Sequence, residues 1–310
     1  MSANVIVGAG PIGSAIARLL ADEGSSVRMI TRSGGGPSHP LIERVAADAA
    51  DARRLTELTE GASTLFNCAN PRYTEWPKLW PPLNDAMIAA ALANDAVYAI
   101  TGNLYVYGPQ PGGHMTEESP LAAVGRKGKV RIKMWQDALA SGVRTVEVRG
   151  SDYIGAGAVG VFSSILLPAI EKGRTAWAPG DVNAPHSFTY TGDQARAMVA
   201  LSRDPRAYGK AWHTPTAPPV SIAELAERYC ALTGAPRLKV RALPRFVMHA
   251  AGVAVPMARE MAEMDYQFYG PFHLDSSLTE KTFGLTPTDL SVGIRETAEA
   301  AKATAARRMA

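Results

Sequence analysis

The sequence predicts an α/β protein in which helices cover both faces of a parallel β-sheet. Two observations support this fold class. Short apolar segments typical of buried strands alternate with segments of helical periodicity over residues 1–150, and a glycine-rich turn joins the first strand to the first helix. We expect strands at residues 4–7, 27–30, 44–47, 64–69, 96–101 and 145–149, and helices at residues 14–21, 81–94 and 126–141.

The turn at residues 8–13 carries the clearest motif. It has the spacing G-x-G-x-x-G and lies between a strand and a helix within a βαβ unit. The first glycine allows a tight turn, the second lets the backbone approach a pyrophosphate, and the third lets the helix pack close to the strand. The N–H groups of the first helical turn then face the anion. The motif predicts a dinucleotide site that includes Gly8, Gly10, Pro11, Ile12 and Gly13, whereas the alternative is a glycine turn with a purely structural role.

The end of the second strand favours NADP over NAD. An NAD site usually has Asp or Glu there, which accepts the ribose 2′-hydroxyl. This chain has Thr31, Arg32 and Ser33 instead, so no carboxylate repels a 2′-phosphate and Arg32 can pair with one. Arg32 could also be an ordinary surface residue. The ends of the third and fourth strands add further expected cofactor contacts, namely Asp48, Cys68, Ala69 and Asn70.

The periodicity changes near residue 150. Residues 1–150 are expected to form the NADP-binding domain, with residues 186–215 packing back on it. Beyond residue 155, Pro and Gly are frequent and the helical segments are shorter, with good helix starts at Thr191 and Ser221. Residues 151–310 are therefore expected to form mostly a smaller C-terminal lobe that binds the substrate.

The composition excludes several classes of protein. The 310 residues include 32 basic and 29 acidic ones, which is too balanced to predict nucleic-acid binding. The two cysteines lie far apart and the six histidines are scattered, so neither a disulfide framework nor a metal site is expected. No apolar segment is long enough to span a bilayer, and no secretory signal is evident. We expect a cytoplasmic protein that does not bind membranes.

Further motifs follow the glycine turn along the chain: Val106-Tyr107-Gly108, Arg149-x-x-x-Tyr153-x-Gly155, and residues 186–193, 219–225 and 275–287. Together with the glycine turn, these motifs resemble the extended short-chain dehydrogenases/reductases, the family of nucleotide-sugar epimerases and dehydratases. The resemblance covers nearly the whole chain. It implies a Rossmann-type, doubly wound parallel sheet and a nicotinamide cofactor, and it suggests a homodimer formed through the helices at residues 81–94 and 126–141.

The residues at the catalytic positions depart from the family pattern. Enzymes of this family use a Ser or Thr together with a Tyr-x-x-x-Lys pair, in which the Tyr exchanges a proton and the Lys lowers its pKa and binds the nicotinamide ribose. By alignment with the family motifs, Asn103 occupies the hydroxyl position, Lys127 the Tyr position and Arg131 the Lys position. This pattern resembles an atypical subgroup with a degenerate active site.

Several residues could still support catalysis. Asn103 could orient a carbonyl, and Lys127 could serve as acid or base if it is buried, could contact the cofactor, or could simply face solvent. Arg131 could hold the nicotinamide ribose or an anionic substrate. Tyr105 and Tyr153 are alternative phenolic acids, with packing as the other interpretation of Tyr105. Three aromatic residues after the fourth strand could meet a substrate or belong to the core: Tyr73, Trp76 and Trp80.

The resemblance implies an NADP-dependent oxidoreductase or epimerase that acts on a small carbonyl or sugar-like substrate with a non-standard acid/base. Two alternatives remain open. Because the Tyr is missing, the chain could be a catalytically inert dinucleotide sensor that signals through a partner. It could also be a lyase or isomerase that holds the cofactor only structurally. The sequence does not choose between reduction, epimerisation and dehydration.

Overall fold

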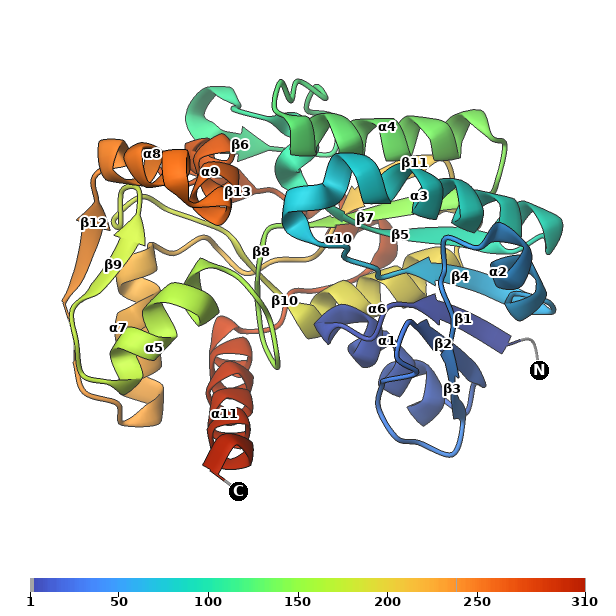
Figure 1. Cartoon of the computed structure of the whole chain (residues 1–310), viewed down its shortest axis with the longest axis horizontal. Helices are drawn as coiled ribbons and strands as arrows, with labels where there is room; N and C mark the ends of the chain where they lie inside the picture. Colours follow the sequence, from blue (N-terminus) through green and yellow to red (C-terminus); the bar gives the residue numbers. More distant parts are fainter. Residues whose placement is uncertain (1–2, 238, 310) are drawn as a thin grey trace. The chain divides into compact units, whose positions relative to one another are not determined.

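A seven-stranded sheet forms the centre of the first of two units in the computed structural model, which describes residues 3–237 and 239–309 (Figure 1). Its strand order is β11-β7-β5-β4-β1-β2-β3, and the pairs β1–β2, β1–β4, β2–β3, β4–β5 and β7–β11 are parallel. The order changes direction between β1 and β4, which confirms the predicted Rossmann-type, doubly wound sheet. The strands are β1 (Ala3–Val7), β2 (Val27–Thr31), β3 (Ile42–Ala46), β4 (Ala62–Asn67), β5 (Val97–Asn103), β7 (Thr145–Gly150) and β11 (Lys210–His213).

Helices lie on both faces of this sheet (Figure 1). One face is covered by α2 (Ala52–Leu58), α3 (Trp76–Ala93) and α4 (Arg126–Ala140), and the other by α1 (Pro11–Asp22) and α6 (Thr191–Ser202). Strands enclosed on both faces need apolar side chains on both sides. Accordingly the core between β4, β5 and α3 contains Leu65, Tyr98, Ile100 and Met87.

Helix α3 begins at Trp76 rather than at Pro81, where we predicted its start, and it continues through Pro81 and Pro82. A proline inside a helix removes a hydrogen bond and crowds the preceding turn. Tertiary packing offsets this cost, because Trp76 and Trp80 are buried against Met134 of α4. The other predicted strands and helices of the first 150 residues lie at or close to their expected positions.

The second unit contains three short, two-stranded parallel pairs: β8 (Asp152–Ile154) with β10 (Phe188–Tyr190), β9 (Ala176–Pro179) with β12 (Val240–Leu243), and β6 (His114–Met115) with β13 (His273–Leu274). Its helices are α5 (Leu167–Glu171), α7 (Ile222–Thr233), α8 (Arg245–Ala254), α9 (Pro256–Glu263), α10 (Ser277–Phe283) and α11 (Leu290–Met309). The core of this unit includes Leu166, Phe188, Leu225 and Ile294. Ser221 accepts a hydrogen bond from the N–H of Glu224 at 3.1 Å, which confirms the predicted start of α7.

Each of the two units is built from three separate segments, which alternate along the chain. Unit 1 consists of Met1–Val106, Arg126–Arg149 and Gln194–Thr214, and unit 2 of Tyr107–Gly125, Gly150–Asp193 and Pro215–Ala310. The predicted ranges placed a single boundary near residue 150 and returned residues 186–215 to the first domain. The observed ranges differ from them chiefly at Tyr107–Gly125, which belongs to unit 2. Among the described residues, no helix combines the length and apolarity that a transmembrane segment requires.

Candidate functional site

The glycine turn after β1 adopts the geometry that its sequence predicts. Gly8 has a φ of +103°, and a Cβ there would lie 2.5 Å from the carbonyl oxygen of Cys68. A Cβ at Gly13 would lie 2.1 Å from the carbonyl oxygen of Gly8, so the fold itself requires both glycines. A Cβ at Gly10, in contrast, would meet no described atom within 4 Å. Gly10 therefore borders open space, directly at the N-terminus of α1.

The ends of β1, β2 and β4 meet beside this turn, at the edge of the sheet where the carboxyl ends of the parallel strands lie. The N–H of Gly8 donates to the carbonyl oxygen of Ile30 at 2.9 Å, and the N–H of Cys68 donates to the carbonyl oxygen of Val7 at 2.9 Å. Ala69, held through its N–H by the Asn67 amide at 3.3 Å, and the exposed Asn70 continue this edge. Ligands of such sheets bind where the strand order changes direction, which is between β1 and β4 here.

The Cys68 thiol at this edge is not set up as a nucleophile. Burial raises its pKa to about 12, although a hydrogen bond with Thr101 opposes the shift. Because the thiolate is the reactive form, Cys68 is a neutral thiol at neutral pH.

The residues after β2 and β3 lie at the same edge. Arg32 and Ser33 are exposed at the end of β2, and Thr31 donates its hydroxyl to the carbonyl oxygen of Gly35 at 3.2 Å. Asp48 is also exposed, and its carboxylate accepts the N–H of Ala50 at 3.0 Å. Arg32 is thus on the surface, directly after the strand that pairs with β1.

Two of the cations on α4 are buried. Lys127 and Arg131 are only 1% and 3% exposed, and their spacing of four residues places both on one face of the helix. The interpretation of Lys127 as a solvent-facing lysine is therefore wrong. Arg131 donates to the carbonyl oxygen of Thr101, and its guanidinium lies 5.2 Å from the centre of the Trp80 ring.

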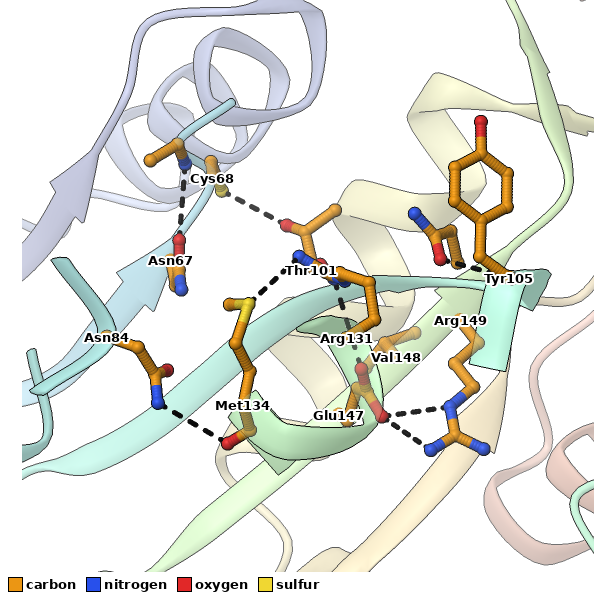
Figure 2. A network of polar contacts seen from close by, with 12 residues as sticks. Asn67, Cys68, Asn84, Thr101, Tyr105, Arg131, Met134, Glu147, Val148 and Arg149 are labelled. Atoms are coloured by element: carbon orange, nitrogen blue, oxygen red, sulfur yellow. Dashed lines mark hydrogen bonds and ion pairs between the residues drawn. The ribbon is translucent and has the colours of Figure 1, made fainter. Parts of the chain in front are cut away.

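A buried carboxylate, Glu147 on β7, lies between two arginines (Figure 2). Arg149 donates to one of its oxygens through two nitrogens, at 2.8 and 2.6 Å, and Arg131 approaches the other oxygen at 3.9 Å. The group of these three side chains, here called the buried ion group, leaves one positive charge in excess. A Cβ at Gly102 would lie 2.8 Å from the side chains of both Glu147 and Arg149, so this position also has to be glycine.

Sequence reasoning missed Glu147, although one signal was present. A carboxylate in the middle of a strand that is buried on both faces needs a cationic partner. That signal indicates a buried pair, but it does not identify Arg131 on another element.

A second buried chain of hydrogen bonds ties the same strands to the helices above them. Asn67 donates to the Tyr98 hydroxyl at 2.7 Å, Tyr98 donates to Asn84 at 2.9 Å, and Asn84 donates to the carbonyl oxygen of Met134 at 3.4 Å. Burial raises the pKa of Tyr98 above its usual range, so this phenol stays protonated. These hydrogen bonds tie α3 and α4 to β4 and β5.

Two phenols from neighbouring strand ends meet at this edge. Tyr73, which follows β4 in the short helical turn η1 (Tyr73–Glu75), and Tyr105, which follows β5 in the turn η2 (Leu104–Tyr107), have their hydroxyl oxygens 3.3 Å apart. The ammonium of Lys127 lies 4.3 Å from the centre of the Tyr73 ring, and the Asn103 amide oxygen accepts the N–H of Tyr105 at 3.2 Å. These four residues are here called the phenol cluster. In Figure 2 the Tyr105 phenol points away from the buried ion group.

The structure thus brings three of the four predicted catalytic residues together and separates the fourth. Asn103, Tyr105 and Lys127 belong to the phenol cluster, whereas Arg131 is engaged by Thr101 and Glu147. Tyr73, which the sequence places either where a substrate could meet it or in the core, is the addition. Tyr153 lies on β8 of unit 2, paired with Thr189.

Unit 2 contains a pocket of its own, with a volume of about 350 Å³. Its wall includes Tyr266, Tyr269 and Phe272 together with Arg245, whose guanidinium is bound by Asp265 at 2.7 Å. Among the described residues, no group of three or more His, Cys, Asp or Glu side chains is arranged to hold a metal ion.

Comparison with known proteins identifies the fold. No protein-family model matches the chain, and no curated protein matches it. Solved structures do match over nearly full length. The UDP-glucose 4-epimerase of Thermotoga maritima, solved with UDP-glucose, has a TM-score of 0.78 and 14% identity over 97% of this chain and 99% of its own. The dTDP-glucose 4,6-dehydratase of Bacillus anthracis, solved with NAD, has a TM-score of 0.78 and 15% identity over 97% of each chain.

A third match is the enzyme WbmH of Bordetella bronchiseptica, solved with NAD⁺, with a TM-score of 0.76 and 20% identity over 97% of this chain and 98% of its own. The chain therefore has the fold of the extended short-chain dehydrogenases/reductases, that of nucleotide-sugar epimerases and dehydratases. The predicted resemblance is confirmed at the level of the fold.

Proposed function

We propose that the chain is an enzyme that binds a nicotinamide dinucleotide at the glycine turn of unit 1 and uses it to reduce or epimerise a small carbonyl or sugar-like substrate. One observation carries the proposal. Gly8 and Gly13 are required by contacts within the protein, whereas Gly10 faces open space at a helix N-terminus, where only a ligand would need a glycine. The enzymes from Bacillus anthracis and Bordetella bronchiseptica, which share the fold, were solved with NAD.

The cofactor is proposed to be NADP(H) rather than NAD(H). The N–H groups at the start of α1 would hold the pyrophosphate, because no helix carbonyl uses them. Exposed Arg32 would pair with the 2′-phosphate, and the sequence at the end of β2 places no carboxylate against it. The bound nicotinamide supplies or accepts the hydride.

The phenol cluster is proposed to handle the proton. As a carbonyl gains hydride at carbon, its oxygen needs a proton, which the Tyr105 hydroxyl would donate. Tyr73, whose hydroxyl donates to that of Tyr105 at 3.3 Å, would pass its own proton to the Tyr105 oxygen, and the ammonium of Lys127 beside the Tyr73 ring would stabilise the Tyr73 phenolate that remains. The roles of Tyr and Lys in the family pattern are thus carried by residues from different elements, with Lys127 supplying the positive charge from the position of the missing Tyr.

Asn103 and Arg131 act as positioning residues in this proposal. The Asn103 amide holds the backbone of Tyr105, and Arg131 fixes the end of β5 through the carbonyl oxygen of Thr101. Both contacts keep the strand end that carries Tyr105 in one conformation.

Titration of the full chain with NADPH and NADH, followed by nicotinamide fluorescence, tests the proposal. We expect NADPH to bind more tightly, and Arg32→Ala to weaken NADPH by about 1–3 kcal/mol while leaving NADH nearly unchanged. If Arg32→Ala weakened the binding of NADPH and NADH equally, a contact between Arg32 and the 2′-phosphate would be excluded. A substrate panel of ketones and nucleotide sugars then separates enzyme from sensor, since tight binding without turnover across the panel would favour the inert dinucleotide sensor.

A further inference from the structure

Helix α8 of unit 2 presents an apolar face outwards. Phe246 is 74% exposed and Val253 is 89% exposed, and Val247 of α8, Val255 and Met257 of α9 are exposed to a lesser degree. Figure 1 shows α8 and α9 side by side at one end of unit 2. Large apolar side chains scattered singly on a surface are ordinary, but several of them within two adjoining helices mark an interaction site.

Polar and apolar contacts both tie α8 to the protein. Arg245 and His249, one turn apart and each about half exposed, both bind the carboxylate of Asp265, at 2.7 and 2.8 Å, and Met248 is buried beside them. Phe246 and Val253, two turns apart, share an outward sector of the helix with the exposed Ala250. The two largest exposed apolar side chains of α8 thus point away from the core, whereas the apolar side of an ordinary surface helix faces it.

The sequence around α8 is strongly basic. Residues 237–259 contain no Asp or Glu, and five cations, all exposed, lie in this segment: Arg237, Lys239, Arg241, Arg245 and Arg259. Because the formal net charge of the whole chain is +3, the remainder of the chain is slightly negative. The basic character of the protein is therefore concentrated in the segment that carries the exposed apolar helix.

We infer that α8 and the cations that flank it dock on an anionic lipid bilayer, with α8 lying flat in the interface. Phe246, Val253 and their apolar neighbours would enter the boundary of the acyl chains, and the flanking cations would face lipid phosphates. An exposed apolar helix face combined with flanking Lys and Arg is the pattern of helices that lie on a membrane surface. The expectation of no membrane partner rested on the lack of a spanning segment, which surface docking does not require.

A second copy of the chain is the main competing occupant, and the charges disfavour it. A two-fold contact through α8 would bring two basic segments together, each with four cations besides Arg245, and no carboxylate within either segment offsets the repulsion. Asp265, the carboxylate that faces α8 from its own unit, is already bound to Arg245 and His249. An anionic surface satisfies both the apolar face and the cations. This inference does not depend on the proposed enzymatic function.

Sedimentation of the full chain with vesicles tests the inference. We expect binding to vesicles of phosphatidylcholine mixed with phosphatidylglycerol, much weaker binding to phosphatidylcholine alone, and weakening as salt is raised. The double variant Phe246→Ser/Val253→Ser should lower binding to the mixed vesicles about tenfold or more. Arg241→Gln/Arg259→Gln should also lower it about tenfold or more, since each cation near an anionic surface contributes roughly fivefold.

Matched controls keep these outcomes interpretable. Val159→Ser removes an apolar side chain that is 79% exposed elsewhere in unit 2, and it should bind vesicles as the wild type does. All the substituted positions are exposed, and circular dichroism checks that each variant is folded. Absence of binding to mixed vesicles, equal binding to neutral vesicles, or unchanged binding of both double variants would overturn the inference. If the wild type does not bind vesicles but forms a dimer, and Phe246→Ser/Val253→Ser dissociates this dimer, α8 would be assigned to self-association instead.

Discussion

Two neighbouring regions at the carboxyl edge of the sheet in unit 1 are built in opposite ways. The turn after β1 consists of backbone. A Cβ at two of its glycines would clash with neighbouring backbone atoms, whereas the third glycine borders open space. The region formed by the end of β5, the start of α4 and β7 consists of side chains instead, with buried charges and phenols held by one another. The first region offers N–H groups to a ligand, and the second holds groups that can move or stabilise charge.

The difference shows what each region demands of the surrounding fold. A glycine turn needs only local backbone geometry, which a few residues specify. A buried ion group needs every partner in place, because a charge left unpaired in the interior is costly, even where the intact group contributes little net stability. We therefore expect substitutions in the second region to change activity or stability strongly. Substitutions in the glycine turn should change stability less.

The largest effect is expected at the phenol cluster, on activity. Tyr105→Phe removes only the hydroxyl that we assign as proton donor, and it should lower kcat about 10²–10⁴-fold while NADPH affinity stays unchanged. Tyr73→Phe should lower kcat less and shift its pH profile, which a purely structural role would not do. Steady-state kinetics across pH, with a substrate that the panel identifies, measures both effects.

Tyr208→Phe provides the matched control for these variants. Tyr208 donates its hydroxyl to the carbonyl oxygen of Ser202 at 2.9 Å, away from the phenol cluster, so its loss should leave kcat and the pH profile unchanged. If Tyr105→Phe behaved like this control, the proton donor would have to be sought elsewhere, and Lys127 would be the next candidate.

The next largest effect is expected at the buried ion group, on stability. Glu147→Gln keeps the shape of the side chain but leaves Arg131 and Arg149 buried without their carboxylate, so the free energy of unfolding should fall by about 3–5 kcal/mol. Chemical denaturation measures the change. Asp137→Asn on α4 is the matched control, because it removes a carboxylate that pairs with Lys133 at the surface, and its effect should be much smaller. Equal effects of the two substitutions would show that Glu147 does not hold the two arginines.

The two regions also differ in how far the sequence predicts them. The glycine turn, the strands around it and the position of Arg32 follow from local patterns, since spacing along the chain fixes which backbone conformations are possible. The phenol cluster does not follow in the same way, because Tyr73 and Tyr105 lie 3.3 Å apart only once β4 and β5 are neighbours. The alignment with family motifs pointed to Lys127, but its burial depends on the packing of α4 against the sheet.

Unit 2 was harder to predict for a related reason. Its strands are short and pair with distant segments, as β6 does with β13 and β9 with β12. Segments of two to four residues show no periodicity that distinguishes a strand from a loop. The outward position of the apolar side chains of α8 does not follow from the sequence either, because it depends on how this helix packs on its own unit.

The smallest changes in stability are expected in the glycine turn, where two substitutions distinguish a structural glycine from one that a ligand requires. Gly13→Ala places a Cβ 2.1 Å from the carbonyl oxygen of Gly8, so the backbone must shift, and stability should fall by about 1–3 kcal/mol. Gly10→Ala meets no described atom and has an ordinary φ of −68°, so stability should change by no more than about 1 kcal/mol. Denaturation without nucleotide measures both. NADPH titration should then show weakened binding in Gly10→Ala despite its intact fold, because the added methyl group occupies the space where the pyrophosphate would approach. Wild-type affinity in this variant would mean that the open space beside Gly10 is not where a dinucleotide binds.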